Sequence, residues 1–180
     1  RGPAAQAQFI ETMCLLTINH QCLIATKANR MVRAAKGRTV LEFGSRRAQG
    51  ASGAILGARA AFIGGVNGTA CVKADIDFGV PAAGTMAHSW VQMFDSEYEA
   101  FLDYAKSNPD NCVFLVDTFD TLRSGVPNAI KVANDYLIPN GYKLKGIRID
   151  SGDLAYLSKK SRKMLDDAGF KDATICLSNG

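Results

Sequence analysis

Five short apolar segments that alternate with helical patterns constrain the fold of this chain more than any other feature. They begin near residues 39, 80, 112, 143 and 173. Short apolar runs bounded by Gly, Pro and Asn are typical of buried strands. Their alternation with helices is typical of βα units joined by right-handed crossovers. The sequence therefore predicts an α/β protein with a parallel sheet.

The helical patterns predict where the remaining elements lie. Apolar residues recur at helical spacing through residues 5–35, which predicts a long, largely buried helix, or two consecutive helices, stopping near Gly37. Ser96 and Glu99 have capping-box spacing, which predicts a break near Ser96 in the helix predicted at 87–105. The predicted strands are 39–44, 80–84, 112–117, 143–150 and 173–178, and the predicted helices are 53–65, 69–79, 87–105, 126–138 and 151–168.

Two architectures fit this order of elements: an open, doubly wound sheet and a (β/α) barrel. A complete barrel takes about 250 residues. Five strands in 180 residues therefore predict a barrel of about five βα units that is incomplete. Whether these residues are the whole protein is left open.

Composition excludes several classes of protein. The net charge of +4 and the pI of about 8.8 fall short of the clustered positive charge that nucleic acid binding requires. The chain has five cysteines in apolar surroundings and no C-x-x-C pair, which predicts buried, free thiols and a reducing, cytoplasmic location. The absence of an apolar run of about 18 residues argues against a membrane protein.

Polar side chains follow the ends of the predicted strands. Functional groups of parallel α/β folds gather at the carboxyl ends of strands. Arginines there predict an anionic ligand, and carboxylates predict Mg²⁺ or ribose hydroxyls. A phosphorylated sugar with a second anionic group fits this chemistry. The strand-end residues are Glu42, Phe43, Arg46, Arg47, Thr85, His88, Asp117, Thr118, Asp120, Arg123, Arg148, Asp150, Ser151, Asp153, Ser178 and Asn179.

Structural roles compete with this interpretation. Arg46 and Arg47 could form an ion pair with Glu42, and Asp117 could cap a helix. Ser151 could be an N-cap, with Asp153 in the first turn of the same helix. His20 could be a core residue whose polar atoms are hydrogen-bonded. Arg148 and Asp150 are different, because they alternate along a predicted strand and should point the same way. For His88, a site role and a structural role are both open.

Three segments together resemble the nicotinate phosphoribosyltransferase family. They are "LEFGSRRAQG" at 41–50, "GTMAHSWV" at 84–91 and "GIRIDSGDL" at 146–154. The helical run before them is also similar to that family. The resemblance implies coupling of nicotinate to 5-phosphoribosyl 1-diphosphate, driven by ATP hydrolysis, in NAD biosynthesis.

The resemblance also implies an architecture and partners. The fold would be a (β/α) barrel of the phosphoribosyltransferase type, with residues 1–38 as a helical segment leading from an N-terminal domain and 39–180 as a partial barrel domain. A homodimer, Mg²⁺ and ATP as co-substrate are implied, without nucleic acid or membrane. The metal ligands stay unknown, with Asp150 as the one candidate.

Roles for individual residues follow from the resemblance alone. His88 would be phosphorylated, Thr85 would lie near the nicotinate, and Arg148 would hold its carboxylate. Asp150 would lie near the ribose or the metal. The remaining expected contacts are Phe43 on the pyridine ring, Arg46 or Arg47 on phosphate or pyrophosphate oxygens, and Asp117 on the ribose.

Three alternatives remain at this point. A nicotinamide-using phosphoribosyltransferase would share the fold, and a non-catalytic half-barrel fragment would retain the motifs without activity. The family's stacking tyrosine and its later phosphate-binding loops have no counterpart in this sequence, so the activity of these residues alone is left open. A barrel aldolase would need a Schiff-base lysine at a strand end, and Lys145 lies inside its predicted strand.

Overall fold

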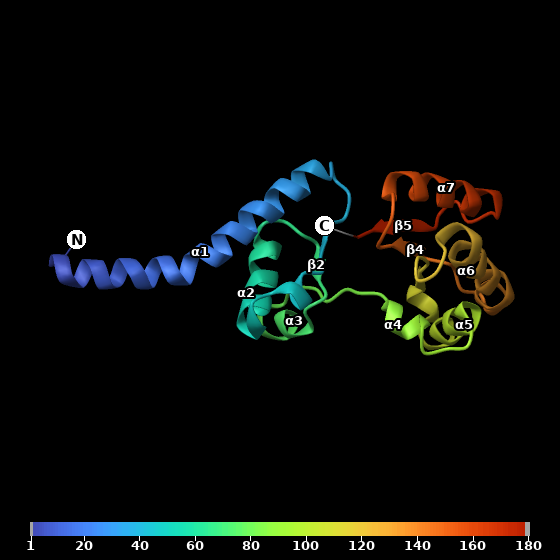
Figure 1. Ribbon diagram of the computed structural model, residues 1–180, viewed down its shortest axis with the longest axis horizontal. Coiled ribbons are helices and arrows are strands. Elements are labelled where there is room, and N and C mark those ends of the chain that lie inside the picture. Colours follow the sequence, from blue (N-terminus) through green and yellow to red (C-terminus); the bar gives the residue numbers. More distant parts are fainter. Residues whose placement is uncertain (1, 179–180) are drawn as a thin grey trace. The chain divides into compact units, whose positions relative to one another are not determined.

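The computed structural model describes residues 2–178, so Asn179 of the strand-end residues lies outside the described part of the chain. The chain divides into two compact units, one ending at Gly84 and the other beginning at Thr85, and each contains one small parallel sheet. Figure 1 labels their helices and strands. The α/β class is confirmed. The domain boundaries at 1–38 and 39–180 stay a prediction.

The first unit pairs two very short strands. Strands β1 and β2 run parallel, with Leu41 opposite Gly68 and Glu42 opposite Thr69. The sequence did not predict β2, because two residues are too short to produce a pattern. The strand predicted at 80–84 is a single bridge from Ala82 to Thr69. The elements are α1 (Ala4–Ala34), β1 (Leu41–Glu42), the 3₁₀ turn η1 (Ser45–Arg47), α2 (Gly50–Ile63), β2 (Gly68–Thr69) and α3 (Val72–Phe78).

Helix α1 is one continuous helix, and the prediction that it is largely buried is wrong for this structure. Among its described residues, Ala28 alone is fully buried. Its C-terminal half lies beside α2, while its N-terminal half extends past α2 (Figure 1). The two helices can approach closely because Gly64, at the end of α2, has no Cβ. A Cβ at this position would lie only 2.6 Å from the carbonyl oxygen of Ala25 in α1. Among the residues described, no helix is long and apolar enough to cross a membrane.

The second unit is a three-stranded parallel sheet in the order β3-β4-β5, with α5, α6 and α7 packed against it (Figure 1). The predicted break at Ser96 is confirmed, because its side chain accepts a hydrogen bond from the backbone N–H of Glu99. The elements are α4 (His88–Val91), α5 (Glu97–Ser107), the 3₁₀ turn η2 (Pro109–Asn111), β3 (Val113–Leu115), the π-helical turn η3 (Thr121–Gly125), α6 (Val126–Val132), the π-helical turn η4 (Ala133–Leu137), the 3₁₀ turn η5 (Ile138–Asn140), β4 (Gly146–Ile149), α7 (Leu154–Asp167) and β5 (Thr174–Leu177).

The core of this unit lies between the sheet and its helices. Phe101 of α5 stacks on Phe114 of β3, with ring centroids 4.7 Å apart. Ile147 and Ile149 of β4 are fully buried in the same cluster. Because side chains alternate along a strand, Arg148 between them points to the opposite face. The packing of the two isoleucines therefore fixes the direction of the arginine.

Gly125 allows η3 to lie directly under β3. A Cβ at this position would lie 1.8 Å from the carbonyl oxygen of Val116. We expect Gly125→Ala to lower the free energy of unfolding of this unit by more than the ~1–3 kcal/mol typical of an overpacked core, measured by urea denaturation. Gly84→Ala is the control, since its added Cβ meets nothing within 4 Å. Equal midpoints for the two variants would contradict the packing argument.

The cysteines correct one prediction from the sequence. All five are free, but Cys14 and Cys22 are exposed, whereas Cys112 is buried. Burial raises the pKa of Cys112 to about 12. Its thiol therefore stays protonated and behaves as a small apolar core group.

Candidate functional site

The carboxyl ends of β3, β4 and β5 bring three polar residues side by side. Leu115 and Cys176 both pair with Arg148 in the register of the sheet. Two residues further along the three strands come Asp117, Asp150 and Ser178. The ladder continues to this level, because the N–H of Ser178 donates to the carbonyl of Ile149 at 3.0 Å. The parallel register therefore places these three side chains on the face to which Arg148 points.

Three hydrogen bonds hold the guanidinium of Arg148 at this edge. Its Nη1 donates to the hydroxyl of Thr85 at 3.0 Å, and its Nη2 donates to Asp150 Oδ1 at 3.0 Å. Its Nε donates to the hydroxyl of Ser178 at 2.8 Å. The side chain is 12% exposed, so the planar guanidinium is fixed and mostly shielded from water.

His88 stands at the first residue of α4 and faces two carboxylates. Its Nδ1 lies 3.0 Å from the hydroxyl of Thr118. Its Nε2 lies 3.6 Å from Asp150 Oδ2 and 3.9 Å from Asp117 Oδ1. The imidazole is 37% exposed. The indole N–H of Trp90 donates to the carbonyl of Ala100 at 3.2 Å and anchors α4 in the core. The imidazole of His88 is therefore held where solutes can reach it.

Asp117 is the most buried charged group of the site. Its side chain is 2% exposed. Oδ2 accepts from the backbone N–H of Asp150 at 2.9 Å and from the hydroxyl of Ser151 at 2.6 Å. Oδ1 is buried and makes no hydrogen bond with the described residues. A buried acceptor without a partner is costly, and this one is directed toward His88.

The surroundings of Asp150 favour its charged form. Burial acts to raise the pKa of this carboxyl, but the Ser178 hydroxyl, which donates to Oδ1, and the neighbouring Arg148 and His88 outweigh burial. The pKa of Asp150 is therefore below its ordinary value. The carboxylate thus stays ionised at neutral pH, which an acceptor of hydroxyl hydrogen bonds requires.

Two structural roles suggested for strand-end residues are corrected. The N-cap of α7 is Asp153, which accepts from the N–H of Tyr156, whereas Ser151 donates to Asp117. The cap after β3 is Asp120, which accepts from the N–H groups of Leu122 and Arg123. Asp117 is therefore no helix cap. His20 is exposed, although its ring contacts the carbonyl of Gly53 at 3.2 Å, so a core position is wrong for it.

The first unit carries the other strand-end residues. Glu42 accepts from the N–H of Gly44 and from the hydroxyl of Thr69, the latter at 2.6 Å. The proposed ion pair of Glu42 with the two arginines does not form among the described residues. Arg46 and Arg47 lie exposed on η1, where their charges face solvent. Phe43 is half-buried and has contacts of its own.

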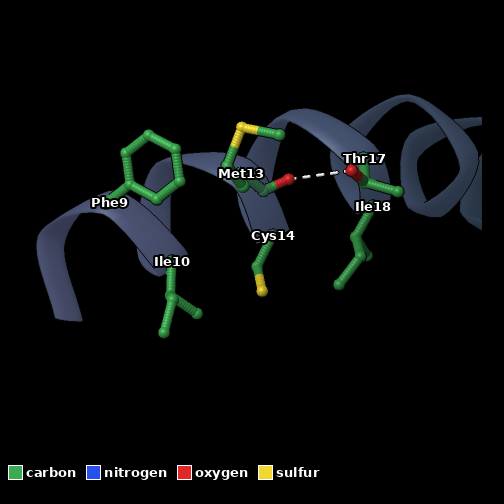
Figure 2. Close-up of a pocket in the computed structure, with 6 residues that line it drawn as sticks. All are labelled: Phe9, Ile10, Met13, Cys14, Thr17 and Ile18. Atoms are coloured by element: carbon green, nitrogen blue, oxygen red, sulfur yellow. Dashed lines mark hydrogen bonds between the residues drawn. The ribbon is translucent and has the colours of Figure 1, made fainter. Parts of the chain in front are cut away.

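Shallow apolar hollows line the N-terminal half of α1 (Figure 2). In this view Phe9 and Met13 point to one side of the helix, and Ile10, Cys14 and Ile18 point to the other. The hydroxyl of Thr17 is not free, because it donates to the carbonyl of Met13 at 2.8 Å. The residues that line these hollows carry no positive charge, so the hollows do not suit an anionic ligand.

Oxygen atoms at the site fit a hard divalent cation only in part. Asp117 Oδ1 has no hydrogen-bond partner, and Asp150 Oδ2 faces the same side, toward His88. Mg²⁺ is commonly held by one or two carboxylates together with substrate phosphates. The described residues contain no group of three or more His, Cys, Asp or Glu side chains placed to hold a metal alone. A metal ion at this edge would therefore need further ligands from a substrate or from water.

Two residues acquire a place in the site that the sequence did not give them. Thr118 and Ser178 were recognised only as strand-end residues, without a role. Thr118 contacts His88, and Ser178 contacts both Arg148 and Asp150. The available signal was a hydroxyl just beyond an apolar strand, which also describes many ordinary loop residues.

Comparison with known proteins agrees with this geometry. A model of the nicotinate phosphoribosyltransferase (NAPRTase) family matches residues 39–178. A nicotinate phosphoribosyltransferase of Bacillus subtilis is 53% identical over 178 residues, covering 99% of this chain and 36% of its own length. One from Dictyostelium discoideum is 40% identical, with 99% of this chain and 38% of the relative covered. The chain thus spans well under half of these relatives.

Solved structures agree as well. Human nicotinic acid phosphoribosyltransferase superposes with a TM-score of 0.90 at 29% identity, covering 99% of this chain and 46% of that one. A nicotinate-nucleotide pyrophosphorylase from Pyrococcus furiosus superposes with a TM-score of 0.76 at 27% identity, covering 89% and 41%. Both likenesses extend over nearly the whole of this chain.

Proposed function

This chain belongs to the nicotinate phosphoribosyltransferase family, and from that premise we propose that its second unit carries the nicotinate end of a phosphoribosyltransferase site. The reaction couples nicotinate to 5-phosphoribosyl 1-diphosphate and releases nicotinate mononucleotide and pyrophosphate. The observation that carries the proposal is the convergence of Arg148, Asp150, Asp117, Thr85 and His88 at the carboxyl edge of one parallel sheet.

Arg148 is the proposed ligand of the nicotinate carboxylate. A guanidinium offers a planar fork that matches the two carboxylate oxygens, and Ser178, Thr85 and Asp150 hold its plane fixed. A fixed carboxylate aims the pyridine nitrogen at C1 of the ribose. Such prior orientation replaces a search in solution and lowers the barrier to bond formation. The hydroxyl of Thr85 lies beside the guanidinium and would face the same ring.

Asp150 and Asp117 are the proposed ligands of the ribose side. Breaking the bond between C1 and pyrophosphate leaves positive charge on the ribose, and two carboxylates at this edge stabilise it. They also accept hydrogen bonds from ribose hydroxyls. We propose Mg²⁺ as the cofactor, with Asp150 as its candidate carboxylate ligand. Asp117 Oδ1, which has no hydrogen-bond partner among the described residues, faces the same side of the site. When bound with the substrate phosphates, the ion would neutralise charge on the leaving group.

His88 is the proposed acceptor of the γ-phosphoryl group of ATP. An imidazole nitrogen attacks the phosphorus, a nitrogen–phosphorus bond forms, and ADP leaves. Two features of the ring support this proposal: it is partly exposed, and its Nδ1 contacts the hydroxyl of Thr118. Phosphorylated His88 would add negative charge beside Asp150, which would change the affinity of the site for anionic ligands.

For the first unit, we propose that Arg46 and Arg47 bind phosphate or pyrophosphate oxygens. Both are exposed, and neither has an ion pair among the described residues. One well-placed donor of this kind is worth ~2.7–4 kcal/mol in related transition states. The same proposal gives Phe43 a stacking contact with the pyridine ring.

The architecture that accompanies this function is a phosphoribosyltransferase barrel to which the strands of this chain contribute. We further propose a cytoplasmic homodimer. The five free cysteines suit a reducing compartment. The alternatives are a nicotinamide-using relative and a non-catalytic fragment.

A competition assay tests the function. The intact protein, supplied with 5-phosphoribosyl 1-diphosphate, ATP, Mg²⁺ and equal concentrations of nicotinate and nicotinamide, should form nicotinate mononucleotide as its main product, measured by chromatography. Arg148 should bind the charged carboxylate of nicotinate more tightly than the neutral amide of nicotinamide, because hydrogen bonds between charged groups are about twice as strong as neutral ones. Preferential formation of nicotinamide mononucleotide would support the rival enzyme, and binding of both pyridines without product would support a non-catalytic protein.

A further inference from the structure

Ser178 lies between the two side chains that dominate the site. Its hydroxyl accepts a hydrogen bond from Arg148 Nε at 2.8 Å and donates one to Asp150 Oδ1. The guanidinium and the carboxylate also pair directly through Nη2 at 3.0 Å. The three groups therefore close a ring of contacts in which the serine occupies one corner.

The direction of these bonds is fixed by chemistry. An arginine N–H can only donate, and an ionised carboxylate can only accept. The serine hydroxyl has a single proton, so it accepts from Arg148 and donates to Asp150. No other residue in the ring can replace this combination, because Asp150 lacks a donor and Arg148 lacks an acceptor.

The position of the hydroxyl is determined by the sheet. The N–H of Ser178 donates to the carbonyl of Ile149 at 3.0 Å, which continues the ladder between β4 and β5 beyond Leu177. Parallel pairing then places Ser178 beside Asp150, just as Cys176 is placed beside Arg148. The serine is thus held by the backbone, whereas the long side chain of Arg148 has several rotatable bonds.

We propose that Ser178 is a positioning residue for the Arg148–Asp150 pair. It limits rotation of the guanidinium about its Cδ–Nε bond, so that the same edge always faces the ligand. This rests on the proposed function, in which Arg148 binds nicotinate. Ser178 acts on the ligand through Arg148 and Asp150 and makes no contact with it.

Ser178→Ala and Ser178→Thr form a matched pair for testing the proposal. Alanine removes the hydroxyl, whereas threonine keeps it and is well suited to a strand. In the intact protein we expect the KM for nicotinate to rise about fivefold in Ser178→Ala, the equivalent of one ordinary hydrogen bond. We expect kcat to stay nearly unchanged, because the loosened guanidinium weakens binding of the ground state and the transition state equally. Ser178→Thr should restore the KM. Ser107→Ala is the control, since this hydroxyl of α5 is exposed and donates to the carbonyl of Asp103 within the same helix.

A second readout needs no substrate. The Nε–H signal of Arg148, identified in nitrogen NMR spectra by its loss in Arg148→Lys, should exchange faster with water in Ser178→Ala than in the wild type or in Ser178→Thr. Unchanged exchange in Ser178→Ala, or a threonine variant that behaves as the alanine variant does, would overturn the proposal. If exchange changes as expected but the wild type forms no nicotinate mononucleotide, Ser178 keeps its positioning role and the proposed function fails.

Discussion

When the intact protein is incubated with ATP that carries a label in its γ-phosphate, we expect acid-labile label on the protein. Replacing His88 with alanine should abolish that label. The expectation rests on the imidazole, which is held by Thr118 and is 37% exposed. A phosphoryl group on nitrogen is lost in acid and retained in base, which separates it from one on a neighbouring carboxylate. The measurement is the label that remains after brief acid and base treatments.

The other histidine of the chain supplies the matched control. His20 is also exposed, but its ring contacts the carbonyl of Gly53 on α2, and no carboxylate lies beside it among the described ion pairs. His20→Ala should therefore keep the full label. Persistent acid-labile label in His88→Ala would assign the phosphoryl group to a different residue.

Arg148→Lys should raise the KM for nicotinate by about 10- to 100-fold. Lysine keeps the charge but has no planar fork, so it cannot make the proposed two-pronged contact with the nicotinate carboxylate. Each hydrogen bond to a charged group is worth about 1.5–3 kcal/mol, and about 1.4 kcal/mol corresponds to a factor of ten. Steady-state kinetics with nicotinate as the varied substrate gives the value.

Two controls separate this effect from damage to the fold. Arg33→Lys changes an exposed arginine of α1 and should leave the KM unchanged. Thermal unfolding of Arg148→Lys shows whether the loss of buried contacts has destabilised the unit. A rise in KM below about threefold, less than one ordinary hydrogen bond is worth, would count against Arg148 as the nicotinate ligand.

Much of the fold follows from local pattern. The apolar runs at 112–117, 143–150 and 173–178 contain β3, β4 and β5. Strands β3 and β4 are largely buried, and their sequences are accordingly apolar. The break at Ser96 was readable for a similar reason, since a cap is a contact over three residues. Strand β2 was missed because a two-residue strand leaves no pattern in the sequence. Helix α1 was predicted to be buried because its apolar residues do not show whether another part of the structure covers them.

The candidate site shows the same division. Arg148 and Asp150 could be paired from the sequence, because they are two residues apart on one strand. The partners of Asp117 could not, since its contacts with Ser151 and with the N–H of Asp150 cross between two strands. Choosing between Ser151 and Asp153 as the cap of α7 also depended on that contact: once Ser151 donates to Asp117, the carboxylate of Asp153 caps the helix.

The sequence alone determined the α/β class, the positions of β3, β4 and β5 along the chain, and the family, because hydrophobic periodicity and short motifs are written in neighbouring residues. Only the tertiary structure decided that His88, from the start of α4, lies 3.6 Å from Asp150 and that Ser178 joins Arg148 to that carboxylate. The physical reason is the parallel register, which brings together strand ends that are about 30 residues apart along the chain. Residue spacing does not encode such distances; the hydrogen-bonded ladder between strands sets them.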